Sequence, residues 1–374
     1  MTPLSLYVHV PFCASRCGYC DFNTYTSAEL GPDVSRDTFH RYLIDEIAMA
    51  RAALGPREVH TVFFGGGTPT LLGPAALAEI LAAIEQGFGL APGAEVTTEA
   101  NPDSVDPAAF DALLAAGFTR VSLGMQSTAP HVLATLERTH APGRGVAAAR
   151  EARAAGFEHV NLDLIYATPG ETDDDLRRSV DDALSAGIDH LSAYALVVED
   201  GTPLARRVRR GELPLPDDDV AAHRYELIDD ALAGAGLRWY EVSNWSRPGG
   251  ECQHNLAYWR NADWWGIGPG AHGHLAGHRW WNHKHPATYA DALRAGGLPR
   301  AGEEHLSAEE AELERVMLGL RMREGLVTGG LDPVAIEALV DRGLVDAGQA
   351  RAGRLVLTRT GRLLGDEAVR VLTA

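Results

Sequence analysis

Four segments of the chain share one order of apolar and polar positions, in which an alanine-rich helical end precedes a glycine, an apolar residue and a β-strand pattern. The segments are AAGFTRVSLGMQ (115–126), AAGFEHVNLDLIY (154–166), SAGIDHLSAYAL (185–196) and GAGLRWYEVS (234–243). Glycine ends a helix at little cost because it adopts the left-handed conformation without steric conflict. Each of the four glycines therefore marks a junction between a helix and a strand; they are Gly117, Gly156, Gly187 and Gly236.

The same patterns predict that strands and helices alternate along much of the chain. Strands are expected at 4–10, 59–65, 95–99, 120–126, 159–166 and 190–198. Such alternation implies parallel strands that are joined by right-handed crossovers. The predicted fold class is therefore α/β, a partial (βα)6 TIM-like barrel, with a candidate seventh unit at 237–242.

The pattern changes beyond about residue 305. The segment SAEEAELERVMLGLRMREGL (307–326) predicts an amphipathic helix, and the short helical and strand patterns after it resemble a winged-helix domain. We expect three parts: a partial barrel at 1–235, a barrel extension at 236–304 and a small α+β, winged-helix-like domain at 305–374.

The charge of the chain excludes some classes of partner. The 51 acidic and 33 basic residues give a net charge of −18, which repels phosphate backbones, so nucleic acid is not expected as a partner. Residues 306–374 hold nine basic and eleven acidic residues and show no basic face for DNA. The N-terminus lacks the pattern of a secretion signal and no apolar run reaches membrane-spanning length, so we expect a soluble, cytoplasmic protein.

Polar and glycine-rich stretches follow the predicted strands. In (βα) barrels the chemistry lies at the C-terminal ends of the strands, because the loops there converge on one rim. Here a cysteine-rich loop follows the first strand and GGGTPT (65–70) follows the second. The later strands end in EANP (99–102), GMQS (124–127) and DLIYATPG (163–170).

Three of the four cysteines, Cys13, Cys17 and Cys20, have the spacing C-x3-C-x2-C. Four cysteines in a long chain do not form a disulfide framework, and a reducing cytoplasm would not keep one oxidised. The spacing fits thiolates that wrap a single 4Fe-4S cluster. Zinc is the competing interpretation, although structural zinc usually takes four ligands. Chance clustering of structural cysteines is the other alternative. Three thiolates on four irons leave one iron open as a reaction site.

The stretch YVHVPFCASRCGYCDF (7–22) resembles the signature of the radical S-adenosylmethionine (SAM) enzymes. The resemblance implies a radical SAM barrel with a 4Fe-4S cluster on the three cysteines and SAM on the open iron. It also implies SAM-binding roles for Glu99, Gln126, Arg138 and Asp163, a place for Tyr7 beside the cluster, and close backbone approach at Gly66, Gly67 and Thr68. The alternative for each of these residues is a purely structural role as a polar residue at the rim of the barrel.

One branch of the family is closest: the oxygen-independent coproporphyrinogen III dehydrogenases and the related HemW-type haem chaperones. The resemblance covers nearly the whole chain, including NLDLIYATPGET (161–172) and residues 240–273. The dehydrogenases carry a further cysteine where this chain has Phe22, and they have an N-terminal extension that this sequence lacks. Both departures favour a chaperone.

The stretch HNLAYW (254–259) matches the H-N-x-x-Y-W motif, which in the chaperones of this family is associated with haem binding. His254 offers an imidazole for iron, and Tyr258 and Trp259 offer flat apolar surface, with Asn255 between them. Residues 252–285 hold five of the seven tryptophans and six of the fifteen histidines. Ordinary core packing is the bland alternative. Other candidate ligands are His272, His274 and His278, and the role of Cys252 stays open.

We expect a haem chaperone that carries haem as cargo to acceptor haemoproteins such as respiratory enzymes, so the protein could also lie peripherally at a membrane. The resemblance implies a homodimer, but no interface is evident in the sequence. The enzyme alternative is an oxygen-independent coproporphyrinogen III oxidase, and Phe22 is the discriminating residue. A nucleic-acid-modifying radical SAM enzyme is disfavoured by the acidic charge. Whether SAM is cleaved in function stays open.

Overall fold

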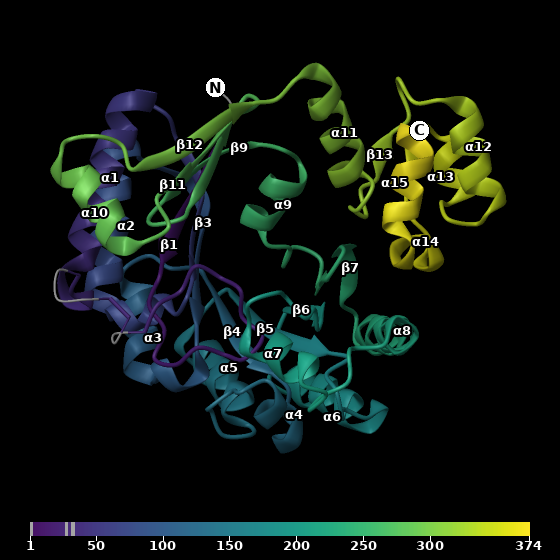
Figure 1. The fold of residues 1–374 in the computed structure, drawn as a ribbon, viewed down its shortest axis with the longest axis horizontal. Coiled ribbons are helices and arrows are strands. Elements are labelled where there is room, and N and C mark those ends of the chain that lie inside the picture. Colours follow the sequence, from purple (N-terminus) through teal and green to yellow (C-terminus); the bar gives the residue numbers. More distant parts are fainter. Residues whose placement is uncertain (1–2, 27–28, 31–33) are drawn as a thin grey trace.

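The computed structural model describes residues 3–26, 29–30 and 34–374. Within these residues, one mixed sheet of twelve strands curves through the molecule, and a small two-stranded sheet lies near the C-terminus (Figure 1). The strand order in the large sheet is β12-β11-β10-β9-β1-β2-β3-β4-β5-β6-β8-β7. Its centre is therefore the row of strands that the sequence predicts, with later strands added at both edges.

Six parallel strands form the partial barrel, in sequence order from β1 to β6. They are β1 (Leu4–Val10), β2 (Val59–Gly66), β3 (Leu90–Ala100), β4 (Arg120–Gln126), β5 (His159–Tyr166) and β6 (His190–Ala195). The six predicted strands are confirmed to within a few residues; β3 begins earlier, because Leu90 already pairs with Val59. One large apolar core, which includes Leu6, Val62, Val121 and Leu162, lies between the strands and the surrounding helices.

Helices follow the strands and cover the outside of the barrel (Figure 1). They are α1 (Arg36–Leu54), α2 (Pro74–Phe88), α3 (Pro107–Ala115), α4 (Pro130–Thr135), α5 (Arg144–Ala155), α6 (Asp173–Ser185), α7 (Pro203–Arg209) and α8 (Asp218–Gly234), with 3-10 turns at Pro69–Leu72 and Pro102–Ser104. The four glycines predicted to end helices have positive φ angles of 101°, 111°, 75° and 82° in sequence order, which confirms that prediction.

The predicted seventh unit is wrong. The strand at this place, β7 (Arg238–Glu241), pairs antiparallel with β8 (Asn244–Ser246), and β8 pairs antiparallel with β6. Only two residues separate β7 from β8, whereas a parallel pair needs a crossover of a dozen or more residues. The seventh parallel strand is instead β9 (Asp263–Ile267), which pairs with β1 at the opposite edge.

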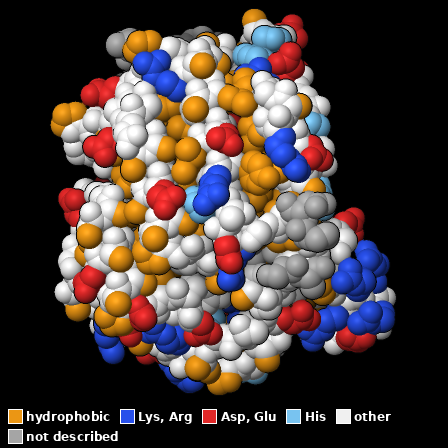
Figure 2. Space-filling view, turned by 90° about the vertical axis from the view of Figure 1, so that its left-hand side faces the viewer, with side chains coloured by type: hydrophobic (Ala, Val, Ile, Leu, Met, Phe, Trp, Pro, Cys, Tyr) orange, Lys and Arg blue, Asp and Glu red, His pale blue; other side chains and the backbone are white. Residues whose placement is uncertain are grey.

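The segment after β8 extends the sheet beyond β1. It contains α9 (Gln253–Trp259), β10 (His272–Leu275), β11 (His278–Asn282), α10 (Pro286–Arg294) and β12 (Arg300–His305). The strands β10, β11 and β12 are antiparallel to their neighbours. Figure 2 shows the face on the left of Figure 1, where acidic and basic side chains are interspersed among apolar ones. None of the helices among the described residues is long and apolar enough to cross a membrane.

A single buried carboxylate ties α1 to this extension. Glu46, 1% exposed, accepts hydrogen bonds from the Gly268 amide (2.7 Å), the Asn282 amide group (2.7 Å) and the Tyr289 hydroxyl (2.6 Å). Burial raises the pKa of Glu46 to about 7, although the three donors oppose the shift. The carboxylate thus connects three segments that are distant in the sequence.

The C-terminal domain has its own apolar core, which includes Val316, Leu320, Leu339 and Leu355. It consists of α11 (Ala308–Gly319), β13 (Leu326–Val327), α12 (Pro333–Asp341), α13 (Ala347–Arg351), β14 (Arg354–Leu355), α14 (Arg359–Leu363) and α15 (Gly365–Thr373). Its first helix has a capping box between Ser307 and Glu310. This is an α+β domain, as predicted.

We predict that Glu46→Gln changes the pH dependence of stability. A folded-state pKa above the ordinary value means that Glu46 stabilises the protein fully below about pH 4.5 and loses this contribution as the pH rises through about 7. Between pH 5 and pH 8 the free energy of unfolding of the wild type should therefore fall relative to the variant by roughly 2–3 kcal/mol. Urea unfolding at both pH values measures this. The exposed Glu85→Gln on α2 is the control, and parallel curves for Glu46→Gln would contradict the prediction.

Candidate functional site

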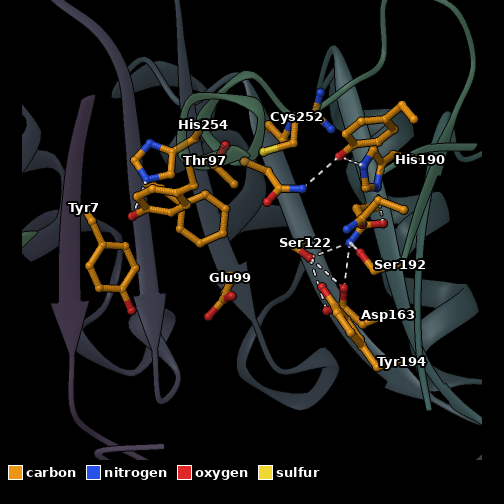
Figure 3. A pocket seen from close by; sticks show the side chains of 17 residues that line it. Tyr7, Thr97, Glu99, Ser122, Asp163, His190, Ser192, Tyr194, Cys252 and His254 are labelled. Atoms are coloured by element: carbon orange, nitrogen blue, oxygen red, sulfur yellow. Dashed lines mark hydrogen bonds between the residues drawn. The ribbon is translucent and has the colours of Figure 1, made fainter. Parts of the chain in front are cut away.

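The inside of the barrel contains a cavity of about 150 Å³, which we call the barrel cavity (Figure 3). Side chains of a β-strand alternate between its two faces, so residues two positions apart point into the barrel together. The inward positions supply much of the lining: Tyr7 on β1, Phe63 on β2, Thr97 and Glu99 on β3, Arg120 and Ser122 on β4, Asn161 and Asp163 on β5, and His190, Ser192 and Tyr194 on β6.

One wall of the barrel cavity is aromatic. The Phe63 ring stacks on the His254 ring at 5.2 Å between centroids, and Tyr258 meets His254 edge-on at 4.8 Å. Tyr7 lies on the same side, 6.3 Å from Phe63 and 6.5 Å from His254 (Figure 3). This wall offers flat surfaces for the planar part of a ligand.

The facing wall is a chain of hydrogen bonds across β4, β5 and β6 (Figure 3). Asp163 accepts hydrogen bonds from Ser122 (3.2 Å) and from the Asn161 amide group (2.7 Å). Asn161 Oδ1 lies 2.7 Å from His190 Nδ1, and His190 Nε2 lies 2.8 Å from the Tyr240 hydroxyl. These polar groups hold one another in place and fix the carboxylate of Asp163.

Two buried carboxylates give the barrel cavity its electrostatic character. Burial, and then the charge of Asp163, raise the pKa of Glu99 to about 8, against the hydrogen bond from the Gly66 amide (3.1 Å). Burial also raises the pKa of Asp163, which Ser192, Asn161, Ser122 and Arg138 oppose. A cation or a group of hydroxyls between the carboxylates would relieve this cost.

Gln126 and Arg138 lie beside Gly124 at the end of β4. A Cβ atom on Gly124 would lie 2.9 Å from Gln126 Nε2 and 3.3 Å from Arg138 Nη2, so only glycine leaves them room. Gln126 has a φ angle of 65°, which costs free energy for a residue other than glycine and is typical of functional sites. Arg138 also donates to the Gly124 carbonyl oxygen (2.7 Å) and to Cys17 Sγ (3.3 Å).

The cysteine loop lies where the sequence predicts, at the mouth of the barrel after β1. Its backbone is held by hydrogen bonds from the Cys13 amide to Tyr25 O (3.0 Å) and from the Cys20 amide to Cys17 O (3.2 Å). Burial raises the pKa of Cys13 to about 11, so this thiol stays protonated until a metal binds. Among the described residues, no group of three or more His, Cys, Asp or Glu is arranged to hold a single metal ion.

The glycine-rich turn after β2 packs directly against this loop. The Gly67 amide donates to Val10 O (2.8 Å), and the Thr68 amide donates to Phe12 O (2.7 Å). A Cβ atom on Gly67 would lie 2.4 Å from Phe12 O and 3.1 Å from Cys13 Sγ, so the close approach requires glycine. The turn thus sets the position of the first cysteine.

The HNLAYW residues do not form one surface. His254, Asn255 and Tyr258 line the barrel cavity, whereas Trp259 packs with Leu256 against the C-terminal domain. Both ring nitrogens of His254 are occupied: Nδ1 lies 2.8 Å from Thr61 Oγ1 and Nε2 lies 2.9 Å from the Tyr258 hydroxyl. Burial lowers the pKa of His254 to about 3, so the ring is neutral. This geometry does not favour His254 as a ligand of haem iron.

An ion pair that the sequence analysis missed holds this segment in place. Arg120 donates through Nε to Glu95 Oε2 (2.9 Å) and through Nη2 to Gly250 O (2.8 Å), and both side chains are buried. Glu95 Oε1 in turn accepts hydrogen bonds from the His254 amide (3.0 Å) and from the Cys252 thiol (3.4 Å). Charged residues at inward positions of strands were the signal that the sequence offered.

The residues present fit a polar, cationic cofactor. Buried polar atoms without a hydrogen-bond partner among the described residues include Thr97 Oγ1 and Arg120 Nη1, whose side chains line the barrel cavity, and Arg138 Nε. Buried polar groups normally have partners, so these atoms indicate a bound ligand or water. Together with two carboxylates and three neighbouring thiols, they suit an amino-acid-containing cofactor beside an iron-sulfur cluster.

Comparison with known proteins gives consistent matches. The sequence model of the radical SAM superfamily matches residues 7–183. "Heme chaperone HemW" of Mycobacterium tuberculosis is 60% identical over 99% of this chain and 95% of that protein, and "Heme chaperone HemW" of Bacillus subtilis is 33% identical over 97% of each. The structure of coproporphyrinogen III oxidase (HemN) from Escherichia coli, a radical SAM enzyme, matches with a TM-score of 0.85 at 22% identity over 100% of this chain and 90% of that one. The predicted fold class is confirmed.

We predict that Asp163→Asn lowers the pKa of Glu99, because it removes the like charge that disfavours ionisation. Infrared difference spectra over a pH titration follow the C=O stretch of the protonated carboxyl group. Glu99→Gln identifies the band, and the band of the wild type should disappear near pH 8. A Glu99 pKa that is ordinary in the wild type, or that Asp163→Asn leaves unchanged, would contradict the assignment.

Proposed function

The chain belongs to the radical SAM superfamily, in the branch that contains the HemW haem chaperones, and we propose that it is a haem chaperone that binds a 4Fe-4S cluster and SAM and passes haem to acceptor proteins. The observation that carries the proposal is the 60% identity to a protein named as a haem chaperone, which extends over 99% of the chain. Identity over this length includes the cysteine loop, the barrel and the C-terminal domain.

The cysteine loop and the barrel cavity would hold the two cofactors. Cys13, Cys17 and Cys20 would bind three irons as thiolates, and Arg138, 3.3 Å from Cys17 Sγ, would offset part of their charge. When bound, the cluster and SAM supply one-electron chemistry at the sulfonium. Glu99 and Asp163, whose pKa values are raised in the barrel cavity, would bind the ammonium group or the hydroxyls of SAM.

The remaining predicted SAM residues would complete this site. Gln126 is held next to Arg138 by the narrow space over Gly124, which fixes the direction of its amide group. Tyr7 lies between the glycine turn and His254 and would cover the ligand from the aromatic wall. Backbone groups near the cluster would come from Gly66, Gly67 and Thr68.

The alternative function is oxygen-independent coproporphyrinogen III oxidation. The structural match to HemN, at 22% identity, shows the fold alone. Phe22 stands 59% exposed at the barrel mouth, where the oxidases are expected to carry a cysteine, so no thiol is available there. The relatives that cover nearly the whole chain are named haem chaperones, which supports transfer of haem rather than its synthesis.

Acceptors of the haem would be haemoproteins such as respiratory enzymes, and a homodimer is the proposed state of the chaperone. Transfer needs reversible binding, because a carrier that holds haem more tightly than the acceptor would not release it. The acidic net charge of −18 would favour acceptors that present a basic surface near their haem site.

We predict that Cys17→Ser abolishes cluster binding and that Cys252→Ser retains it. Cys17 lies on the cysteine loop, whereas Cys252 is buried inside the barrel and its thiol donates a hydrogen bond to Glu95. After anaerobic reconstitution, iron analysis should give about four irons per chain for the wild type and Cys252→Ser, and far fewer for Cys17→Ser. The reverse pattern, or equal iron in all three, would contradict the cluster site.

We also predict that the haem-loaded protein restores the absorption spectrum of an apo-haemoprotein. The measurement follows the Soret band of the acceptor after mixing, with free haem at the same concentration as the control. Anaerobic incubation with coproporphyrinogen III and SAM should give no product. Turnover of coproporphyrinogen without specific haem binding would replace the proposed function with the enzyme alternative.

A further inference from the structure

A second cavity, of about 580 Å³, lies between the extended sheet edge and the C-terminal domain. We call it the interdomain cavity. Its lining includes Phe22 and Asn23 after the cysteine loop, Trp264, Ala271 and His272 on or beside β9 and β10, and Glu314, Met317 and Leu318 on α11, together with residues of β1, α9 and β11. Tyr7 and Tyr258 line both cavities, so the interdomain cavity adjoins the proposed cofactor site.

Three histidines near this region, His9, His254 and His274, have both ring nitrogens engaged. His9 lines the interdomain cavity, but its Nδ1 lies 3.1 Å from the Tyr7 hydroxyl and its Nε2 lies 2.9 Å from Asn23 O. His274 is buried between Ala262 O (3.2 Å) and the Gly277 amide (3.1 Å). These rings have no free lone pair for a metal, as is also the case for His254.

His272 is the exception. It lines the interdomain cavity from β10 and is exposed, and no hydrogen bond to its ring occurs in the part of the chain that the structure describes. Its nearest recorded aromatic neighbour is Trp281, 6.0 Å away. Another sequence candidate, His278, pairs with Glu303 at 3.1 Å and does not line this cavity. Among the four candidate histidines, His272 alone has a free ring at the wall of a large cavity.

The interdomain cavity suits a flat, largely apolar ligand. Its volume falls within the range of roughly 300–1,000 Å³ that is typical of sites for small molecules and cofactors, and it is larger than the barrel cavity of about 150 Å³. Phe22, Trp264, Met317 and Leu318 supply apolar and aromatic surface. Met317 faces the cavity from the C-terminal domain and carries a thioether, which is a known axial ligand of haem iron.

One cationic side chain, Arg279, lies at the same wall. It forms ion pairs with Glu304, through Nε at 3.6 Å, and with Glu314, which also lines the cavity. Partial burial of the ring at the cavity wall, and then the charges of Lys284 and Arg279, lower the pKa of His272. A neutral imidazole can coordinate a metal, and carboxylates of the same ligand would reach Arg279 in competition with Glu304 and Glu314.

We propose that haem binds in the interdomain cavity with His272 as an axial ligand of its iron, and that Met317 faces it from the C-terminal domain. This proposal rests on the proposed function and adds to it the place and the ligand of the cargo. Because the walls belong to two domains, both domains contribute to the bound state. Haem there would also lie next to the cysteine loop, through Phe22 and Asn23.

The test is haem titration of the full-length protein after cluster reconstitution, followed by the Soret band. The variants are His272→Gly, Met317→Leu, His254→Gln and the neighbouring His278→Gln. We expect His272→Gly to weaken haem binding by at least about tenfold, and free imidazole to restore the Soret spectrum. We expect His254→Gln and His278→Gln to stay within about threefold of the wild type.

Each result has one meaning. Loss of binding in His272→Gly with rescue by imidazole supports the site, and a changed spectrum in Met317→Leu supports the facing ligand. Wild-type affinity and spectrum in His272→Gly overturn the site, as does loss without rescue. If His254→Gln loses binding while its melting curve is unchanged, the site is also overturned, but the chaperone function stands. If the wild type binds no haem at all, the proposed function itself fails.

Discussion

The position of α9 against the barrel strands depends on the buried ion pair between Glu95 and Arg120. It joins β3 to β4. Arg120 also donates to Gly250 O, and Glu95 accepts a hydrogen bond from the His254 amide, so the pair holds the start of α9 against these strands. Removing either partner would leave the other charge buried without compensation, which costs more than the intact pair gains. The His254 amide and the thiol of Cys252 both hydrogen bond to Glu95, so the start of α9 takes its position from this pair.

Local signals account for the part of the fold that the sequence predicts well. Alternating patterns, junction glycines and the cysteine spacing lie within short windows, so the strands β1 to β6 and the position of the cysteine loop follow from them. The pairing of β9 with β1 could not be predicted, because it joins residues that lie more than 250 positions apart. The hairpin of β7 and β8 was misjudged because a strand pattern does not reveal the direction of its partner.

The candidate site divides in the same way. Polar residues at strand ends, such as Glu99 and Asp163, could be chosen from the sequence because strand geometry brings them to one rim. Whether a histidine ring has a free nitrogen could not be predicted from the sequence, because its hydrogen-bonding partners come from distant segments. His254 meets Thr61 of β2, whereas His272 meets no hydrogen-bonding partner among the described residues, and the sequence treats the two alike.

The C-terminal domain has an apolar core that is separate from the core of the barrel, although Leu363 of α14 packs against the barrel core. Ion pairs and apolar contacts both attach it to the barrel. The ion pairs are Arg362 and Arg359 with Asp229, Glu324 with Arg260 and Glu314 with Arg279, and the apolar contacts include the cluster of Tyr240, Leu256 and Met322. These contacts differ in strength: the pair of Glu324 and Arg260 is exposed to water and salt, whereas Arg362 and Asp229 are buried, so separating them would leave charges without compensation. Ionic strength therefore acts on only part of the attachment, because salt screens the exposed ion pairs and leaves the buried and apolar contacts in place.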